Sequence, residues 1–186
     1  MKQKNINTLI HRTLVWGNYY LTRLFYAPLL YCIFHNNIWL IYDSYHKESA
    51  TWKKVLWNRY MELHAASISI DAKFASPLIL PHGVSSIFIT QSAIIGKDCV
   101  VFQQVTIGAN TIKSSKSYGA PAIGDSVYIG AGAKIIGKVT IGNNARIGAN
   151  AIIVKDVPAN TLAVIPEVRL IAKEEQLDNH FNPYLE

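Results

Sequence analysis

Cysteine and charge are both scarce in this chain, and their scarcity excludes several classes of protein. Of 186 residues only two are cysteine, Cys32 and Cys99, and 16% are charged, whereas 50% are hydrophobic. Two distant cysteines indicate neither a disulfide framework nor a CxxC metal site, and so apolar a composition excludes a disordered chain. The start of the chain lacks the charged, apolar and cleavage regions of a signal peptide. The sequence therefore predicts one reduced, cytoplasmic domain with room for an arm.

Acidic residues are absent before Asp43, and this asymmetry indicates that the chain has two parts. Residues 1–60 hold eight Lys and Arg against two acids, whereas the remainder holds ten of each. The same 60 residues hold 13 of the 20 aromatic residues but only one of the 11 glycines. We therefore interpret residues 1–60 as a helical arm, residues 61–170 as the main domain and residues 171–186 as a C-terminal tail.

A six-residue repeat dominates the main domain. A large aliphatic residue recurs at every sixth position, and a small or β-branched residue lies four positions after each of these. The large aliphatic residues form the first register: Ile89, Ile95, Val101, Ile107, Ile123, Ile129, Ile135, Ile141, Ile147 and Ile153. This period fits no α-helix, but it fits a short strand followed by a tight turn, where Gly142, Asn143 and Asn144 would adopt unusual backbone angles. Three units close a coil of 18 residues and stack Ile on Ile, which stabilises each by roughly 1.5–3 kcal/mol. The repeat predicts a β-solenoid of undetermined handedness.

One interruption breaks the repeat between Ile107 and Ile123. These two residues are 16 positions apart, which is no multiple of six. The segment 109–122 (ANTIKSSKSYGAPA) is polar and basic, and we predict that it leaves the solenoid as an extruded loop.

The run from residue 82 to residue 158 resembles the hexapeptide-repeat acyltransferases, especially the serine acetyltransferases and their relatives that O-acetylate sugars. The resemblance is carried by LPHG (80–83), QVTIG (104–108), PAIGD (121–125), YIGAGAKIIG (128–137) and KDVP (155–158). It implies a mainly β fold, a left-handed parallel β-helix with an N-terminal α-helical arm and one extruded loop. It also implies a homotrimer that holds acetyl-CoA between neighbouring coils. In the family the loop leans over the active site, so Lys113, Lys116 and Tyr118 are candidate substrate contacts.

His82 is the candidate catalytic residue. It stands where the solenoid begins, in a Pro-His-Gly context that breaks the repeat and exposes the side chain. Acetyl transfer to a hydroxyl needs a general base, and imidazole, which titrates near neutral pH, suits that role. The alternative is a turn histidine bonded to a backbone carbonyl, but the catalytic His of the family falls at this position. A backbone N–H of the Gly83 turn or of the loop would meet the oxyanion.

Two positions depart from the serine acetyltransferase pattern. The Asp that orients the catalytic His in that family corresponds to Ser67 here, with Asp71 close by. The Arg-His pair that holds the carboxylate of serine corresponds to Gly119-Ala120. Because a charged hydrogen bond is typically worth about 1.5–3 kcal/mol, we do not expect L-serine to be the acceptor. His64, 18 residues before His82, is a weaker catalytic candidate.

The resemblance also suggests contacts for acetyl-CoA. The small residues whose backbone would approach the pantetheine arm are Ala109, Ala131 and Ala149, although the repeat itself requires small residues at turns. Lys155 and Arg169 are candidates for the 3′-phosphate or the pyrophosphate. The closing family motif A-G-[VN]-P-A-[KR] reads AVIPEV at residues 163–168, without its Gly and its basic residue.

The arm has no apolar run near the ~20 residues needed to span a bilayer. Its apolar and aromatic residues, interrupted by Pro28 and Asn36-Asn37, predict two or three helices within residues 6–60. These helices pack on the base of the trimer or lie on a membrane surface through residues 1–42, at the inner face of the membrane. The two arrangements are compatible, because a trimer would present three such arms.

The leading prediction is an O-acetyltransferase that moves acetyl from acetyl-CoA to a hydroxyl of a glycan or sugar intermediate, as in capsule or lipopolysaccharide synthesis. His82 would act as base in a single displacement, because Cys99 fills an inward-facing position and is expected to be inert. The alternatives are a serine O-acetyltransferase and a catalytically inactive trimeric β-helix scaffold. No metal and no nucleic-acid partner are expected.

Overall fold

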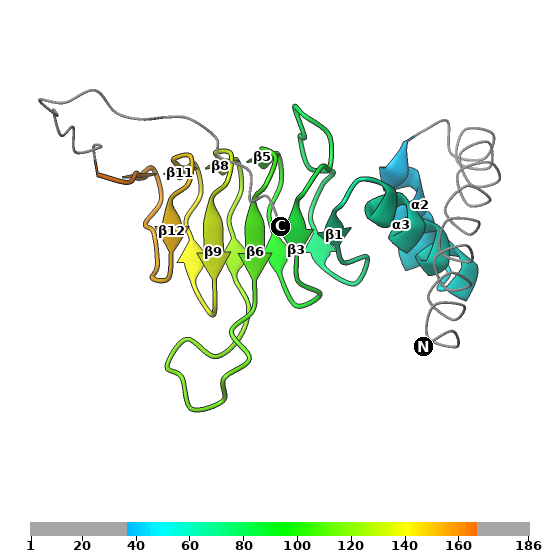
Figure 1. The fold of residues 1–186 in the computed structure, drawn as a ribbon, viewed down its shortest axis with the longest axis horizontal. Coiled ribbons are helices and arrows are strands. Elements are labelled where there is room, and N and C mark those ends of the chain that lie inside the picture. Colours follow the sequence, from blue (N-terminus) through cyan, green and yellow to red (C-terminus); the bar gives the residue numbers. More distant parts are fainter. Residues whose placement is uncertain (1–36, 167–186) are drawn as a thin grey trace, which may run out of the picture.

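Two helices precede a stack of short strands in the computed structural model, which describes residues 37–166 (Figure 1). The helices are α2 (Ile38–Lys47) and α3 (Thr51–Leu63). The strands span two or three residues each and wind into a parallel β-helix that runs from Ser67 to Ala163. This architecture is the solenoid that the six-residue repeat predicts.

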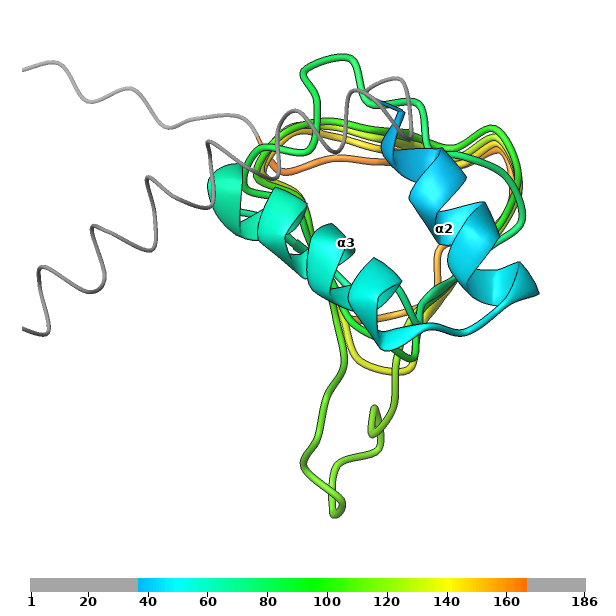
Figure 2. The ribbon, with the colours of Figure 1, turned by 90° about the vertical axis from the view of Figure 1, so that its right-hand side faces the viewer.

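Three parallel sheets form the sides of the triangular tube (Figure 2). Sheet A consists of β1 (Ser67–Ile68), β3 (Phe88–Ile89), β6 (Thr106–Gly108), β9 (Lys134–Ile136) and β12 (Ile152–Ile153). Sheet B consists of β2 (Lys73–Phe74), β4 (Ile94–Ile95), β7 (Ala122–Ile123) and β10 (Thr140–Ile141). Sheet C consists of β5 (Val100–Val101), β8 (Tyr128–Ile129), β11 (Arg146–Ile147) and β13 (Leu162–Ala163). The chain passes repeatedly from sheet A to B to C, so each coil turns at an A/B corner, a B/C corner and a C/A corner.

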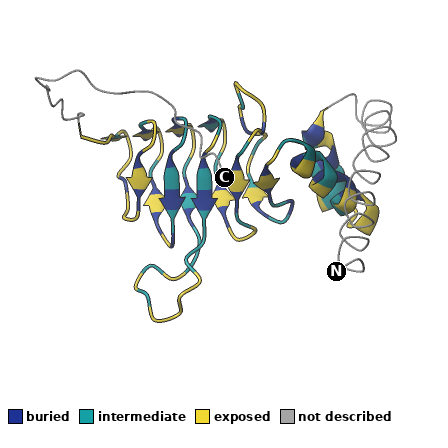
Figure 3. Cartoon of the chain, viewed as in Figure 1, coloured by how far each residue is buried: buried dark blue, intermediate teal, exposed yellow. Residues whose placement is uncertain are grey.

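The aliphatic register of the repeat fills the interior of the tube (Figure 3). Ile129 pairs with Ile147 one coil away, which confirms the coil of 18 residues. Both side chains are fully buried, as are Ile135 and Ile141 between them. Cys99, in the second register, is also fully buried, and this burial raises the pKa of its thiol.

The turns use their glycines and asparagines for different purposes. Of the three residues for which unusual backbone angles were predicted, only Asn144 has a positive φ, of 57°. Gly142 is needed for space instead, because a Cβ at this position would collide with the backbone of Ala159 in the next coil. Asn143 serves a third purpose, since its Oδ1 accepts a hydrogen bond from the Asp125 N–H at 2.9 Å.

Helices α2 and α3 close the N-terminal end of the tube (Figure 2). Trp57 of α3 is fully buried and donates its indole N–H to the Ile68 carbonyl at 2.5 Å. Trp39 and Tyr42 of α2 each pack with ring centroids 5.3 Å from Phe74 of β2. For residues 38–63 the structure therefore shows packing on the β-helix, the first of the two alternatives for the arm.

The membrane alternative concerns residues 1–42, of which residues 1–36 lie outside the described part of the chain. Within residues 37–42, Ile38 and Ile41 are buried against the hydrophobic core. Among the described residues, no helix has the length and hydropathy that a membrane span requires.

Candidate active site

The residues predicted for the site lie at two different corners of the tube. His82 lies at the C/A corner. It follows Ile79, which forms a bridge to Val100 of β5 in sheet C, and it precedes β3 of sheet A. The extruded loop lies at the A/B corner, between β6 and β7, and projects far from the tube (Figures 1 and 2). Within one chain, sheet A separates these two corners.

An enlarged first turn presents His82 to solvent. Ile68 of β1 pairs with Ile89 of β3, 21 residues along the chain, whereas Ile89 pairs with Ile107 after the regular 18. The three additional residues extend the turn that contains His82, and Pro81, His82 and Gly83 are all exposed. Gly83 has a φ of +69° and donates its N–H to the Leu80 carbonyl at 3.0 Å, so this donor is already engaged within the turn. A donor for the oxyanion is therefore better sought in the loop.

Gln103 holds the imidazole of His82 from one coil away. The Nδ1 atom of His82 lies 2.7 Å from Oε1 of Gln103. An amide oxygen only accepts hydrogen bonds, so Nδ1 carries the proton and the lone pair of the neutral ring is on Nε2. Phe102 packs edge-to-face on the same ring, with centroids 5.4 Å apart. Sequence reasoning missed Gln103. Its position in the turn after β5 could have indicated it, because that turn lies one coil above the turn that contains His82 at the C/A corner.

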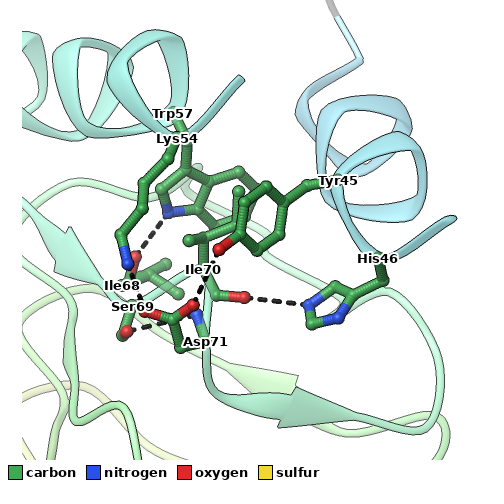
Figure 4. A network of polar contacts seen from close by, with 8 residues as sticks. All are labelled: Tyr45, His46, Lys54, Trp57, Ile68, Ser69, Ile70 and Asp71. Atoms are coloured by element: carbon green, nitrogen blue, oxygen red, sulfur yellow. Dashed lines mark hydrogen bonds and ion pairs between the residues drawn. The ribbon is translucent and has the colours of Figure 1, made fainter. Parts of the chain in front are cut away.

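Ser67 and Asp71, the two positions considered as partners of His82, have other surroundings. Asp71 accepts hydrogen bonds from Lys54 Nζ at 2.6 Å and from the Tyr45 hydroxyl at 3.2 Å (Figure 4). The hydrogen bond from Lys54 lowers the pKa of the Asp71 carboxyl. A cavity of about 350 Å³ between α3 and the start of sheet A is lined by Ser67, Asp71 and Lys54, and His82 is not part of it.

His64 ends helix α3 rather than forming part of a coil beneath His82. Its Nδ1 donates to the Tyr60 carbonyl at 2.8 Å, and the two rings contact each other at a tilt of 32°, with centroids 4.3 Å apart. Its backbone carbonyl accepts from the Ser86 N–H at 3.3 Å. These contacts give His64 a structural role at the junction between helix and solenoid.

The residues predicted to contact acetyl-CoA divide between the two corners. Ala131 and Ala149 follow β8 and β11 at the C/A corner, on the same side of the tube as His82. Ala109 follows β6, and Lys155 follows β12, so both lie at the A/B corner. Arg169 lies outside the described residues.

Asn110 organises the extruded loop. Asn110 and Gly119 exchange two backbone hydrogen bonds of 2.8 and 2.9 Å at its base. The Asn110 amide also donates to the hydroxyls of Ser115 and Ser117, each at 2.9 Å. The three predicted substrate contacts are exposed on this loop: Lys113, Lys116 and Tyr118.

The base of the loop has no space for a larger side chain at Gly119. Its φ is +130°, and a Cβ there would lie 3.2 Å from Cβ of Lys138. The neighbouring Ala120 has no charge, so a cationic clamp at this position is absent from the chain. Within residues 37–166, no group of three His, Cys, Asp or Glu side chains has the geometry to hold a metal ion.

Comparisons with known proteins identify the class of this fold. Residues 121–155 match the bacterial transferase hexapeptide (six repeats) family. The chain is 40% identical over 126 residues to serine acetyltransferase 1, chloroplastic, of Arabidopsis thaliana, which covers 68% of this chain and 39% of that protein. It is 34% identical over 102 residues to the serine acetyltransferase of Synechococcus elongatus, which covers 55% of this chain and 41% of that protein.

Solved structures give the same result. Serine acetyltransferase isoform 3 of Entamoeba histolytica, in complex with cysteine, superposes with a TM-score of 0.62 and 31% identity, over 74% of this chain and 48% of that one. The serine acetyltransferase of Neisseria gonorrhoeae superposes with a TM-score of 0.59 and 29% identity, over 75% of this chain and 52% of that one.

The fold is therefore the left-handed parallel β-helix of a transferase. The chain belongs to the hexapeptide-repeat acyltransferase family. It spans 39–41% of the length of these two curated relatives, so its activity as a whole protein is treated below as a proposal.

The prediction of a glycan acceptor in polysaccharide synthesis is wrong, because the relatives and structural neighbours are serine acetyltransferases and not sugar O-acetyltransferases. That prediction rested on Gly119-Ala120 replacing a charged pair. A missing side chain at one position does not exclude an acceptor, since another cation of the same loop can supply the charge.

Proposed function

We propose that this protein is a serine O-acetyltransferase that uses acetyl-CoA as donor. The observation that carries the proposal is the exposed His82, held through Nδ1 by Gln103 so that Nε2 is available to the acceptor. Similarity to serine acetyltransferases from plants, a cyanobacterium and Entamoeba supports serine as the acceptor.

The geometry of His82 supports a direct transfer. The serine hydroxyl oxygen attacks the carbonyl carbon of the thioester while its proton passes to Nε2 of His82. The tetrahedral intermediate then collapses, the C–S bond breaks, and the proton on Nε2 passes to the departing thiolate. O-acetylserine and CoA are the products. A covalent acetyl-enzyme on Cys99 is not part of this route, because the thiol is buried and burial raises its pKa.

A complete site requires two copies of the chain. His82 occupies the C/A corner and the loop occupies the A/B corner, with sheet A between them. A cyclic trimer whose three A sheets face the central axis would bring the loop of one copy to His82 of the next.

Lys113 and Lys116 are the residues we assign to the carboxylate of serine. Both are exposed on the loop, and neither forms an ion pair with a residue in the described range. The hydrogen bonds of Asn110 hold the loop in shape, so an ammonium group there can be positioned before the substrate arrives. These lysines would replace the charge that Gly119-Ala120 cannot supply.

The test is release of CoA from acetyl-CoA in the presence of L-serine, measured by thiol titration. We expect serine-dependent turnover that D-serine and glycine do not support. Serine-independent hydrolysis alone, or no turnover by a protein that binds CoA, would contradict the proposal, and the second result would favour an inactive scaffold.

A further inference from the structure

The side chain of Lys134 reaches the turn that contains Gln103. Strand β9, which lies next to β6 in sheet A, begins with Lys134 on its outer face, since the following Ile135 is buried inside the tube (Figure 1). Nζ of Lys134 donates a hydrogen bond of 2.6 Å to the backbone carbonyl of Gln104. The residue before Gln104 is Gln103, whose side chain holds His82. A charged donor on sheet A is therefore bonded to the turn that carries the partner of the candidate base.

Gln104 has the left-handed backbone conformation that occurs once in each turn at the C/A corner. The residue with a positive φ lies three positions before the buried residue of the following strand of sheet A: Ala65, Ser86, Gln104, Gly132 and Asn150. Glycine and asparagine adopt this conformation readily, but glutamine does so at a cost, and the φ of Gln104 is +62°. The turn that carries Gln103 therefore depends on contacts with neighbouring coils to keep its shape.

The backbone hydrogen bond to the preceding turn is longest at this corner. The N–H of the left-handed residue donates over 2.8 Å in Asn150 and over 3.0 Å in Gly132. The same bond is 3.3 Å in Ser86 and 3.4 Å in Gln104. Only at Gln104 does a side chain of the described residues also donate to the carbonyl of the left-handed residue. Lys134 forms no ion pair with a described carboxylate, so its ammonium is free to serve this carbonyl.

We propose that Lys134 is a positioning residue for the general base. Its hydrogen bond to the Gln104 carbonyl fixes the turn so that Gln103 Oε1 meets Nδ1 of His82. If the turn moves, Nδ1 loses its acceptor, and the neutral ring also populates the tautomer with the proton on Nε2. That tautomer cannot take the proton of the acceptor hydroxyl through Nε2. The inference rests on the proposed function, in which His82 is the base, and adds a residue that acts through Gln103.

Nitrogen-15 NMR of the full-length chain tests this role without a substrate. Lys134→Met keeps an apolar stem and removes the donor, so the neutral His82 ring should become a mixture of tautomers, whereas the wild-type ring is protonated on Nδ1. Lys134→Arg retains a cationic donor and should restore the wild-type tautomer. Lys97→Met is the matched control, because Lys97 is exposed at the B/C corner, and it should leave the tautomer unchanged.

Turnover with serine gives a second comparison. Lys134→Met should lower kcat about 2- to 10-fold, the effect of one hydrogen bond, with little change in KM for serine or acetyl-CoA. Lys134→Arg should recover most of this loss. Adding Lys134→Met to Gln103→Leu should lower kcat no further than Gln103→Leu alone, because both substitutions act on the same contact with His82.

The two measurements separate this inference from the proposed function. A wild-type tautomer in Lys134→Met, or a further loss of kcat in the double variant, would show that Lys134 does not act through Gln103, while the proposed function stands. A shifted tautomer in Lys134→Met, together with no serine-dependent turnover by wild type, would leave the contact in place and show that the proposed function is wrong.

Discussion

Gln103 Oε1 accepts the Nδ1 proton of His82 over 2.7 Å, across one coil of the β-helix. The serine acetyltransferase pattern assigns this orienting role to a carboxylate, and Ser67 stands at the corresponding position in this chain. A neutral amide fixes the ring and its tautomer as a carboxylate does, but it adds no negative charge to stabilise the imidazolium formed when Nε2 takes a proton. The pair therefore relies on orientation more than on charge.

Substitution of Gln103 should change turnover more than substrate binding. Gln103→Leu removes the acceptor and should lower kcat about 2- to 10-fold, the effect of one neutral hydrogen bond, with little change in KM. Gln103→Glu restores an acceptor and adds a negative charge that favours the imidazolium. Its acid limb in the pH–rate profile should therefore move to higher pH.

The tautomer of His82 can be measured without activity. Nitrogen-15 NMR should show the wild-type ring protonated on Nδ1 when neutral, and a mixture of tautomers in Gln103→Leu. An unchanged tautomer in that variant would show that Gln103 does not position the ring, whatever the acceptor of the enzyme is.

His82→Ala should lower kcat by roughly 10²–10⁴-fold, the range for loss of a general base, and should still bind CoA. His64→Ala is the control, because His64 contacts Tyr60 at the end of α3 and should affect stability only. Near-normal turnover by the His82 variant, or an acetyl-enzyme isolated after a quench, would rule out the direct mechanism.

The double substitution Lys113→Gln and Lys116→Gln should raise KM for serine and leave KM for acetyl-CoA unchanged. The expected increase is roughly 10-fold or more, if one charged hydrogen bond to the carboxylate is lost. Serine ethyl ester, which has no carboxylate, should be used equally well by the variant and by wild type. Equal serine KM values for both proteins would remove the two lysines from the acceptor site.

The Lys54–Asp71 pair should make a small, pH-dependent contribution to stability. Hydrogen bonding to Lys54 lowers the pKa of Asp71 in the folded state. The pair therefore stabilises the fold at pH values above the unfolded-state pKa of Asp, which is near 3.9. This contribution is lost as the pH falls through the lower folded-state pKa. Both side chains are partly exposed, so Asp71→Asn should cost no more than about 1 kcal/mol at pH 7.

Urea unfolding at several pH values measures that difference. Asp98→Asn is the matched control, since Asp98 is exposed and its side chain has no partner in the described range. A wild-type advantage over Asp71→Asn that does not shrink as the pH falls below the unfolded-state pKa of Asp would contradict the assignment of the pair.

Ile141→Asp tests the repeat itself. The side chain is fully buried within the stack of coils, so a carboxylate there should destabilise the fold by about 4 kcal/mol or more. Ile94→Asp places the same change on the outer face of sheet B, where 51% of Ile94 is exposed, and should leave the melting temperature nearly unchanged. Equal melting temperatures for the two variants would show that the inward register is misassigned.

The solenoid was predictable because each hexad meets the same environment as the next. Ile129, Ile135 and Ile147 repeat one buried position, so the pattern itself specifies which residues point inward. The packing of α2 was harder to predict from the sequence, because an aromatic helix face has the same residue pattern whether it covers protein or membrane. The contacts of Trp39 and Tyr42 with Phe74 show that α2 packs on protein, and they exist only once the tube has formed.

By itself the sequence determined that His82 stands at a break in the repeat, because local spacing specifies where the coil cannot continue. It did not determine the partner of His82. A fixed spacing pointed to Ser67, but the first coil has 21 residues between Ile68 and Ile89, and this length changes which side chain lies beside the imidazole. Only the stacking of coils, which joins residues 21 positions apart in the chain, brought Gln103 to Nδ1.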